Sequence, residues 1–502
     1  MITLVALNAR YIHASLGMRY LLANLGALRP RARLLELTIH ERPSDVVERI
    51  LADAPEVVAL GCYIWNVEQT LAVARTLAAV APDVQIVVGG PEVSHETERQ
   101  PIASVADYVI RGEGDVAFAE LAAALVAGER PSAHIIDAAP PDLATLALPY
   151  DLYDDDDIAH RVIYVEASRG CPFRCEFCLS ALDKGVRAFD ETAFLAAMQR
   201  LLDRGARHFK FVDRTFNLAI DSAVRILRFF RERLASAGDV LLHFELVPDR
   251  LPQPLRDEIA QFPAGSLQFE VGVQSMDDEV NRRISRRQSR ERLVDNISFL
   301  RERGVYLHTD LIAGLPGESL ASFGRGFDQL FALGPAEIQV GVLKRLNGAP
   351  IARHDEAFGM IYSSAPPYEV LATADVSFAE LQQIKRFARY WDLVANSGNF
   401  RSLLPLLCAG DSPFEAFFEL SRWLHTQIGQ THSIALDRLA VLLVRFLEAQ
   451  RGEDSTHVRA LLADDYQRSN RSLPRQLGSH DGSERARRRA TKPARQRRWL
   501  RD

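Results

Sequence analysis

Three cysteines, Cys171, Cys175 and Cys178, lie close together in the spacing CxxxCxxC. A loop of this length can turn three sulfurs toward one point, which suits an iron–sulfur cluster held by thiolates. Three thiolates on a four-iron cluster leave one iron without a protein ligand. That open iron would be a place for chemistry.

Structural zinc is the alternative for such a loop, but it needs four ligands and usually a second pair of cysteines downstream. The two other cysteines, Cys62 and Cys408, are isolated in the sequence. The spacing therefore favours a cluster over zinc, and we expect neither Cys62 nor Cys408 to be a ligand.

The chain has 502 residues, 47% of them hydrophobic, which suggests roughly three globular domains. The sequence contains no apolar run as long as a membrane span, no pattern of a secretory signal and no disulfide framework. We therefore expect a cytoplasmic protein without a membrane partner. Residues 471–502 form a basic tail, whose Lys and Arg residues are concentrated at 483–502. We expect this tail to be disordered because it contains few apolar residues. The rest of the chain is acidic, which disfavours binding to nucleic acid.

Residues 1–140 alternate apolar strands with helix-length segments, which predicts a doubly wound, Rossmann-like α/β domain. The expected strands are Ile2–Asn8, Arg33–Ile39, Val57–Gly61, Gln85–Gly89 and Tyr108–Arg111. Asn66 and Gln69 are expected to cap the helix after the third strand.

Glycine-rich turns follow three of these strands, at the end where such folds bind ligands. Backbone without side chains can approach a large flat ligand closely. Turn geometry alone also explains glycines of this kind, so both interpretations remain open from the residues themselves. The candidate residues are Gly61, Tyr63, Gly89, Gly90, Gly112, Glu113 and Gly114.

Residues 141–160 are expected to be a linker whose acidic run, Asp154–Asp157, is solvated. A second β/α series at 161–350 predicts a partial (β/α)6, TIM-like barrel with its active site at the carboxyl ends of the strands. Helical periodicity at 365–470 predicts a mostly helical domain, with its aromatic residues in the core. The expected barrel strands are Val162–Glu166, Phe209–Asp213, Leu241–Leu246, Leu267–Val273, Val305–Ile312 and Ile338–Leu343.

The cysteine motif, with Phe177 before the third cysteine, resembles the signature of the radical S-adenosylmethionine (SAM) superfamily. The resemblance implies a 4Fe-4S cluster on Cys171, Cys175 and Cys178 whose open iron binds SAM. The order of the glycine turns resembles the cobalamin-binding domain that precedes the radical SAM core in a large subgroup, although Asp115 replaces the usual second Glu. The whole arrangement resembles members of that subgroup with a C-terminal domain of unknown function.

Polar residues at the barrel strand ends would contact SAM under this resemblance. Asp213 would accept a hydrogen bond from the SAM amino group, and Arg286 or Arg287 would pair with its carboxylate. The turn at Gly314 would run alongside the adenine of SAM. Each residue alone is equally well explained as a polar residue of a barrel rim. The remaining candidates are Glu245, Gln274 and Ser275.

His13 stands near the position where some cobalamin enzymes carry a cobalt-binding DxHxxG motif. Here the Asp is missing and Gly17 comes one residue late. A carboxylate normally orients such a histidine. We therefore expect His13 to be a cap or a residue near the ligand, not an axial ligand.

The resemblance implies an enzyme that methylates an unactivated carbon: an adenosyl radical would abstract a hydrogen, and the substrate radical would take a methyl group from methylcobalamin. Two alternatives remain, a radical redox, cyclisation or ring-rearrangement reaction without methyl transfer, and a cluster- and cobalamin-bearing sensor. The implied partners are an external reductant of the flavodoxin or ferredoxin type and a small-molecule or peptide substrate. The two cofactor sites should face each other, since reacting atoms must meet.

Overall fold

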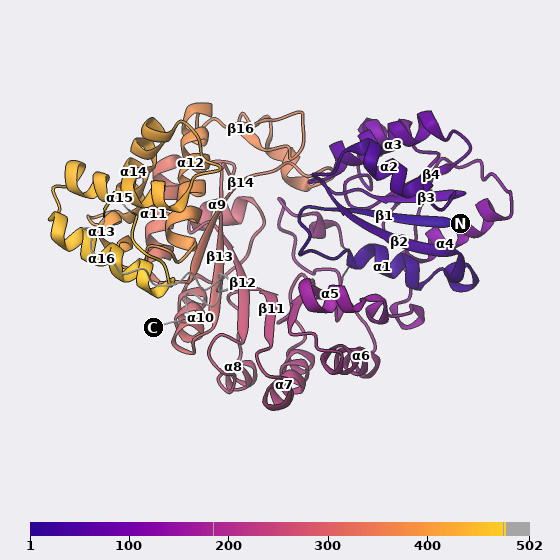
Figure 1. Cartoon of the computed structure of the whole chain (residues 1–502), viewed down its shortest axis with the longest axis horizontal. Coiled ribbons are helices and arrows are strands. Elements are labelled where there is room, and N and C mark those ends of the chain that lie inside the picture. Colours follow the sequence, from indigo (N-terminus) through magenta and orange to yellow (C-terminus); the bar gives the residue numbers. More distant parts are fainter. Residues whose placement is uncertain (184, 475, 478–502) are drawn as a thin grey trace. The chain divides into compact units, whose positions relative to one another are not determined.

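The computed structural model describes residues 1–183, 185–474 and 476–477, and the chain divides into two compact units (Figure 1). The first unit comprises Met1–Glu245, Lys344–Ala352 and Ser363–Glu369. The second comprises Leu246–Leu343, Arg353–Tyr362 and the chain from Val370 onward. The basic residues at 483–502, for which disorder was predicted, lie outside the described residues.

A six-stranded parallel sheet in the order β2-β1-β3-β4-β5-β6 begins the first unit. All five predicted strands are present, and the short sixth strand was not predicted. The strands are β1 (Ile2–Asn8), β2 (Ala32–Thr38), β3 (Val57–Gly61), β4 (Gln85–Gly89), β5 (Tyr108–Arg111) and β6 (Ile135–Asp137).

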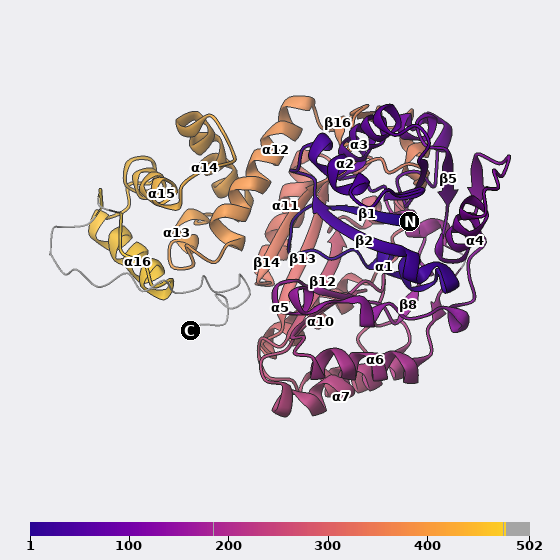
Figure 2. The same ribbon diagram turned by 45° about the vertical axis from the view of Figure 1, so that its right-hand side comes forward.

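Helices cover both faces of this sheet (Figures 1 and 2). Apolar side chains of α2 (Pro43–Leu51) and α3 (Val67–Val80) pack in one core cluster with Val5, Val58 and Val88. Those of α1 (Leu16–Ala23) and α4 (Asp115–Val126) pack on the opposite face with Leu4, Ala59 and Val87. Neighbouring residues of each strand thus point into different cores, as the pleat requires. The predicted doubly wound domain is confirmed.

The segment at 141–160 is more than a solvated linker, so this part of the prediction was wrong. It forms two short 3-10 turns, Leu143–Thr145 and Tyr150–Leu152, and the helix α5 (Asp155–His160). Asp154 and Asp157 form a capping box at the start of α5. Asp157 is only 5% exposed. The acidic run therefore initiates a helix and contributes one buried charge.

The first unit also holds three parallel strands of the β/α barrel, β7 (Ile163–Val165), β10 (His208–Phe211) and β11 (Leu241–Leu246). Helices α6 (Glu191–Asp203) and α7 (Ile220–Ala237) connect them. Two very short strands, β8 (Ser168–Arg169) and β9 (Arg187–Ala188), pair antiparallel and enclose the cysteine-bearing loop.

The second unit holds three further parallel barrel strands. All six predicted barrel strands are present, with ends within two residues of those expected, which confirms the α/β barrel class. The elements are α8 (Gln253–Ile259), β12 (Leu267–Gln274), α9 (Asp278–Arg283), α10 (Arg290–Glu302), β13 (Tyr306–Ala313), α11 (Leu320–Ala332) and β14 (Glu337–Val342).

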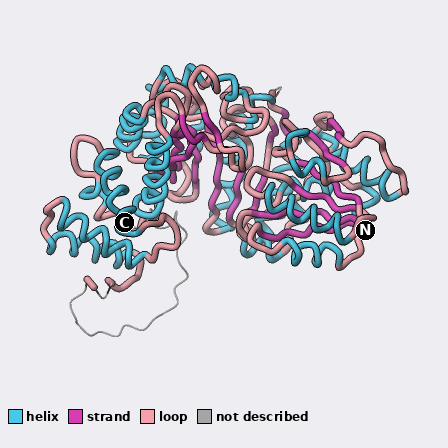
Figure 3. Tube along the Cα trace, turned by 90° about the horizontal axis from the view of Figure 1, so that it is seen from above, coloured by secondary structure: helices cyan, strands magenta, loops and turns pink. Residues whose placement is uncertain are grey.

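The C-terminal segment is mostly helical, as predicted (cyan in Figure 3). Phe387, Trp391, Phe414 and Phe417 are buried together with ring centroids 4.9–5.9 Å apart, so these aromatics form a core. In the described part of the chain, no helix is long and apolar enough to span a membrane. The elements are β15 (Ile361–Tyr362), β16 (Val370–Ala372), α12 (Phe378–Trp391), a π-helical turn (Asp392–Asn396), α13 (Leu404–Leu407), α14 (Pro413–Ile428), α15 (Leu436–Gln450) and α16 (Ser455–Arg468).

Candidate active site

The cysteine loop runs from Gly170 to Val186 between β8 and β9. Gly170 has φ +97°, and a Cβ at this position would lie 2.1 Å from the Gly185 carbonyl oxygen. Glycine is therefore required where the loop closes on itself. Within the loop, the Cys178 N–H donates to the Cys175 carbonyl at 3.0 Å. This turn carries two of the three thiols.

The three motif cysteines differ in environment from the other two. Cys171 is 8% exposed, and its sulfur lies 3.7 Å from Thr215 Oγ1, while Cys175 and Cys178 are partly exposed. Burial raises the pKa of the Cys62 thiol and raises that of Cys408 to about 12. Thiols that resist ionisation are poor metal ligands, because the thiolate is the ligating form.

The number of thiols in the loop suits a cluster better than structural zinc. The loop supplies three cysteines, and structural zinc takes four protein ligands. A 4Fe-4S cluster can take one thiolate on each of three irons and leave the fourth iron open. The three thiols of this loop are the residues that would hold it.

Asp213 follows β10 and contacts the strand that enters the cysteine loop. Its carboxylate accepts hydrogen bonds from the Ala167 N–H at 3.0 Å and from Ser168 Oγ at 2.6 Å. Burial raises the pKa of Asp213 to about 6, although these hydrogen bonds oppose the shift. Its predicted contact with SAM stays a prediction, as does that of Glu245 on β11. Phe177, a candidate cofactor-binding residue of the cysteine motif, is partly exposed.

The second unit carries the other predicted SAM residues, at the carboxyl ends of its strands. Gln274 has φ +69° at the end of β12. Arg286 donates to the Gly272 carbonyl. Gly314 has φ +82°, and a Cβ there would lie 2.6 Å from Val370 Cγ1, so glycine is needed for packing against β16. Their contacts with SAM stay predictions.

Ser275 and Glu318 form a buried pair in the second unit. The Ser275 hydroxyl donates to Glu318 Oε1, whereas Glu318 Oε2 is buried without a hydrogen-bond partner. Burial raises the pKa of Glu318 to about 8, against the opposing effect of Ser275. At neutral pH this carboxyl is therefore mainly protonated.

We expect the stability of the second unit to fall between pH 6 and 8. A raised pKa in the folded state means that the folded unit binds more protons than the unfolded chain in this window, so stability is lost as pH rises, by at most about 1.4 kcal/mol per pH unit for one proton. The Glu318→Gln variant keeps an oxygen for Ser275 and should make this dependence shallower, while His308, whose pKa is also raised, keeps its own contribution. Hydrogen exchange of β12 and β13 at both pH values measures it, and equal slopes in both proteins would contradict the assignment.

A row of polar residues on β13 and β14 was missed by the sequence analysis. His308 Nε2 lies 2.7 Å from Gln339 Oε1 and 3.3 Å from Asp310 Oδ1. Burial lowers the pKa of His308, but the hydrogen bond and charge of Asp310 outweigh it and raise the pKa to about 9. Alternation along β13 places His308 and Asp310 on one face, and that spacing of two is the signal that could have identified them.

A cavity of about 730 Å³ opens at the carboxyl ends of β1, β3, β4 and β5 in the first unit. Its lining includes the buried apolar residues Ala6, Ala59, Val87 and Phe118. The lining includes every glycine-turn residue predicted from the sequence, namely Gly61, Tyr63, Gly89, Gly90, Gly112, Glu113 and Gly114.

The same cavity is lined by residues of the barrel part of the first unit. Tyr164, Glu166 and Arg169 belong to β7 and β8 or the link between them, and Val212 and Arg214 follow β10. The lining thus reaches to within two residues of Cys171. The glycine turns and β8, the strand that leads into the cysteine loop, thus line one cavity of this unit. That the glycine turns face the three cysteines stays a prediction.

The turn after β3 is held by Asn66. Its Oδ1 accepts the Tyr63 N–H at 2.8 Å, and its Nδ2 donates to the carbonyls of Leu7 at 3.1 Å and Gly61 at 3.0 Å. The predicted capping of α3 by the Asn66 side chain was wrong, because these bonds occupy it. The turn presents the stacked rings of Tyr63 and Trp65, 4.4 Å apart, to the cavity. An aromatic wall and glycine turns around an apolar interior fit a large flat ring such as that of cobalamin.

His13 lines the cavity, and its Nδ1 lies 2.7 Å from the Tyr164 hydroxyl. Burial lowers the pKa of His13, which favours the neutral ring. Ser15, not His13, caps α1 by accepting the Met18 N–H. The position is compatible with a residue near the ligand, and its exclusion as axial ligand stays a prediction.

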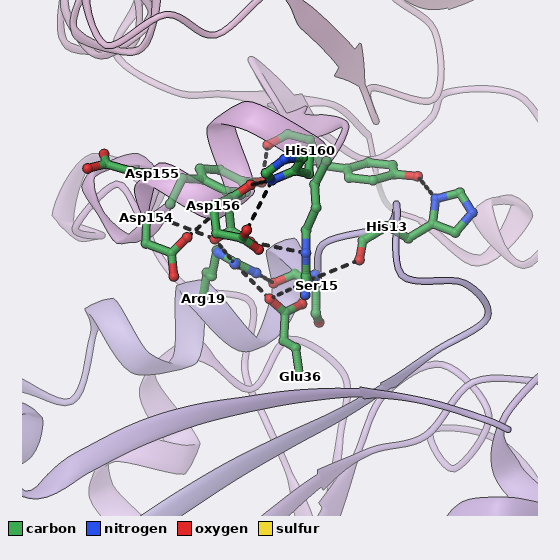
Figure 4. Close-up of polar contacts among 12 residues, drawn as sticks. His13, Ser15, Arg19, Glu36, Asp154, Asp155, Asp156 and His160 are labelled. Atoms are coloured by element: carbon green, nitrogen blue, oxygen red, sulfur yellow. Dashed lines mark hydrogen bonds and ion pairs between the residues drawn. The ribbon is translucent and has the colours of Figure 1, made fainter. Parts of the chain in front are cut away.

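A buried ion-pair network fixes the loop that carries His13 (Figure 4). Arg19 Nη2 lies 2.7 Å from Glu36 and 2.6 Å from Asp157. Arg161 pairs with the same two carboxylates at 3.0 and 3.3 Å. Glu36 also accepts the Ser15 N–H at 2.5 Å. The network joins α1 and β2, which are near neighbours in the sequence, to the distant helix α5 and the Arg161 that follows it.

The turn after β4 is completed by residues from late in the chain. Glu92 is 4% exposed, and its carboxylate accepts hydrogen bonds from Asn347 Nδ2 at 3.0 Å and from the Tyr368 hydroxyl at 2.7 Å. Burial raises the pKa of Glu92, and these two donors oppose the shift. Gly90 precedes it with φ +113°, where a Cβ would lie 2.5 Å from the Cys62 carbonyl oxygen.

Three family profiles match the sequence, in an order that follows the structure. "B12 binding domain" matches residues 2–122, "Radical SAM superfamily" matches residues 165–329, and "Protein of unknown function (DUF4080)" matches residues 356–501. The first covers the doubly wound domain, the second the cysteine loop and most of the barrel, and the third the C-terminal helices.

Curated relatives and solved structures point to the same group. The chain is 26% identical over 350 residues (62% of the chain, 50% of the relative) to the 2-(S-pantetheinyl)-carbapenam-3-carboxylate methyltransferase of Streptantibioticus cattleyicolor. It is 27% identical over 353 residues (62% of the chain, 49% of the relative) to the cobalamin-dependent radical SAM methyltransferase TokK of Streptomyces tokunonensis. The chain thus spans about half the length of these two relatives.

The fold is similar to that of the cobalamin-dependent SAM radical enzyme OxsB, solved with aqua-cobalamin and SAM. The two share 12% sequence identity with a TM-score of 0.62, over 93% of this chain and 83% of the other. This likeness shows the fold. In sequence, residues 2–122 are similar to the B12 binding domain and residues 165–329 to the radical SAM superfamily, so the chain resembles radical SAM proteins that carry a B12-binding domain ahead of the radical SAM domain.

Proposed function

We propose that this protein is a cobalamin-dependent radical SAM enzyme that methylates an unactivated carbon of its substrate. The observation that carries the proposal is the shared cavity of the first unit. Its wall is formed by the glycine turns of the B12-binding domain on one side and by Tyr164, Glu166 and Arg169 on the other. A methyl group can pass between two centres only if they approach to contact, and one cavity permits this.

The residues of the chain hold the bound groups in position and exclude water, while the bound groups supply the chemistry. A 4Fe-4S cluster, SAM and cobalamin, when bound, would supply the adenosyl radical and the methyl group. Cys171, Cys175 and Cys178 would hold the cluster, and Asp213 holds the strand that enters their loop. The buried apolar residues of the cavity lining would exclude water from the reacting groups.

The relatives favour methyl transfer over the alternative radical reactions and over a sensor. Two of them are named as methyltransferases, one of a carbapenam carboxylate. We propose the same reaction class for this chain, on a small-molecule or peptide substrate. An external one-electron reductant of the flavodoxin or ferredoxin type, in the cytoplasm, would complete the reaction.

Anaerobic reconstitution with iron, sulfide, cobalamin and SAM tests the proposal. Because each methylation consumes one SAM for the radical and one for the methyl group, we expect 5′-deoxyadenosine and S-adenosylhomocysteine to form together in the presence of substrate. Omission of cobalamin should abolish S-adenosylhomocysteine. Formation of 5′-deoxyadenosine alone would replace the proposal with a redox or ring-forming reaction, and failure to cleave SAM would favour the sensor.

A further inference from the structure

Two arginines that flank the cysteine loop bind one carboxylate of the B12-binding domain. Arg169 on β8 pairs with Glu113 Oε2 at 3.0 Å. Arg187 on β9 donates to the other oxygen, Glu113 Oε1. Glu113 lies in the turn between β5 and α4, which lines the cavity. Each oxygen of Glu113 thus holds one side of the loop that carries the three cysteines.

Arg169 is fixed by further partners on several sides. Its guanidinium lies 2.8 Å from Asp115 and 2.9 Å from Glu166, and it stacks 4.6 Å from the Tyr20 ring centroid. The side chain is 15% exposed. A planar guanidinium with several carboxylate partners has little freedom to move. Arg169 therefore holds β8 at a fixed position relative to the turn at 111–115.

Arg187 is anchored less strongly, which makes it the more useful residue for an experiment. Its Nη1 donates to the Pro141 carbonyl at 2.8 Å, and its side chain is 36% exposed. Replacement of a half-exposed arginine removes the contact with Glu113 without leaving a deeply buried charge unpaired.

The cysteine loop needs such an anchor because its own base is weak. Strands β8 and β9 contribute only two paired positions, Ser168 with Ala188 and Arg169 with Arg187. A two-stranded ladder alone is marginally stable in water. The contacts to Glu113 attach both strands of this ladder to the neighbouring domain.

We propose that Glu113, Arg169 and Arg187 form a positioning clamp that sets the separation between the cluster and the cobalamin crevice. The inference rests on the proposed function, since it presumes that both groups bind. It assigns Glu113 to the alignment of the two sites, whereas the family resemblance implied a direct contact with cobalamin. None of the three residues needs to touch substrate.

Electron paramagnetic resonance of the holoenzyme measures this separation. In reconstituted protein that contains both the reduced cluster and cob(II)alamin, the cluster accelerates the spin relaxation of cob(II)alamin, and the effect falls steeply with distance. The variants are Glu113→Gln, Arg187→Gln, their double variant and Arg187→Lys. The matched control is Glu191→Gln, which removes a partly buried carboxylate, 27% exposed against 30% for Glu113, that is bound by Arg225 on α7 of the same unit.

We expect Glu113→Gln and Arg187→Gln each to reduce the relaxation enhancement several-fold in molecules that hold both groups, and Arg187→Gln to leave the iron and cobalamin contents unchanged. The loss of relaxation enhancement in the double variant should be smaller than the sum of the losses in the two single variants, since both residues act through one contact. Arg187→Lys should restore part of the effect by keeping a charge for Glu113, and the control should match the wild type.

Unchanged relaxation in Arg187→Gln with both groups bound would overturn the clamp and leave the proposed function intact. An equal loss in Glu191→Gln would also overturn it. Wild-type protein that binds the cluster but no cobalamin would contradict the proposed function itself, and the clamp with it.

Discussion

Replacement of Cys171 with alanine is expected to abolish both the 4Fe-4S cluster and SAM cleavage. Removal of one of three thiolates leaves two irons without protein ligands. Cys62 and Cys408 cannot substitute, since both are buried with raised pKa values, that of Cys408 at about 12. Iron and sulfide contents, the brown absorbance and 5′-deoxyadenosine formation are the measurements.

Cys408→Ala is the matched control, because it removes a buried thiol that lies directly after α13 in the second unit. It should retain the cluster and its activity. Equal loss of iron in both variants would show that Cys408 is needed and would refute the three-cysteine assignment.

Replacement of Arg19 with methionine is expected to destabilise the first unit by about 3–5 kcal/mol, the usual cost of removing one partner from a buried ion pair. Glu36 and Asp157 would remain as buried carboxylates that share Arg161 alone. Native-state hydrogen exchange of α1 and α5 reports the stability of the unit that contains them.

Arg200→Met provides the comparison for this result. Arg200 is 51% exposed, and its carboxylate partner Asp151 is 69% exposed, so the loss should stay below about 1 kcal/mol. Similar losses in the two variants would mean that burial does not set the contribution of the Arg19 network.

Strands were predictable from the sequence because a buried parallel strand is a short, continuous apolar run. Val57–Gly61 and Gln85–Gly89 match the structure to the residue. The strand Ile135–Asp137 was missed because it is a short edge strand whose residues are partly exposed. Strands β8 and β9 have two residues each, too few for any periodicity.

The shared cavity was predictable from topology, since the carboxyl ends of parallel strands meet at one edge. The partners of individual charged residues could not be predicted from the sequence. Glu113 lies 56 positions from Arg169 and 74 from Arg187, and a sequence does not state which distant charges pair. Composition likewise made Asp154–Asp157 resemble a solvated run, although Asp157 is buried against Arg19.

The hydrogen bonds of Glu92 have a consequence for biosynthesis. Its donors, Asn347 and Tyr368, follow it by 255 and 276 positions. Domains generally fold one after another as the ribosome releases them, but a nascent chain that has reached only residue 343 holds neither donor. The turn at Gly90 to Glu92 is then incomplete, even though every strand of its sheet has already been made. The cofactor crevice therefore matures late in translation, after the whole barrel has been synthesised.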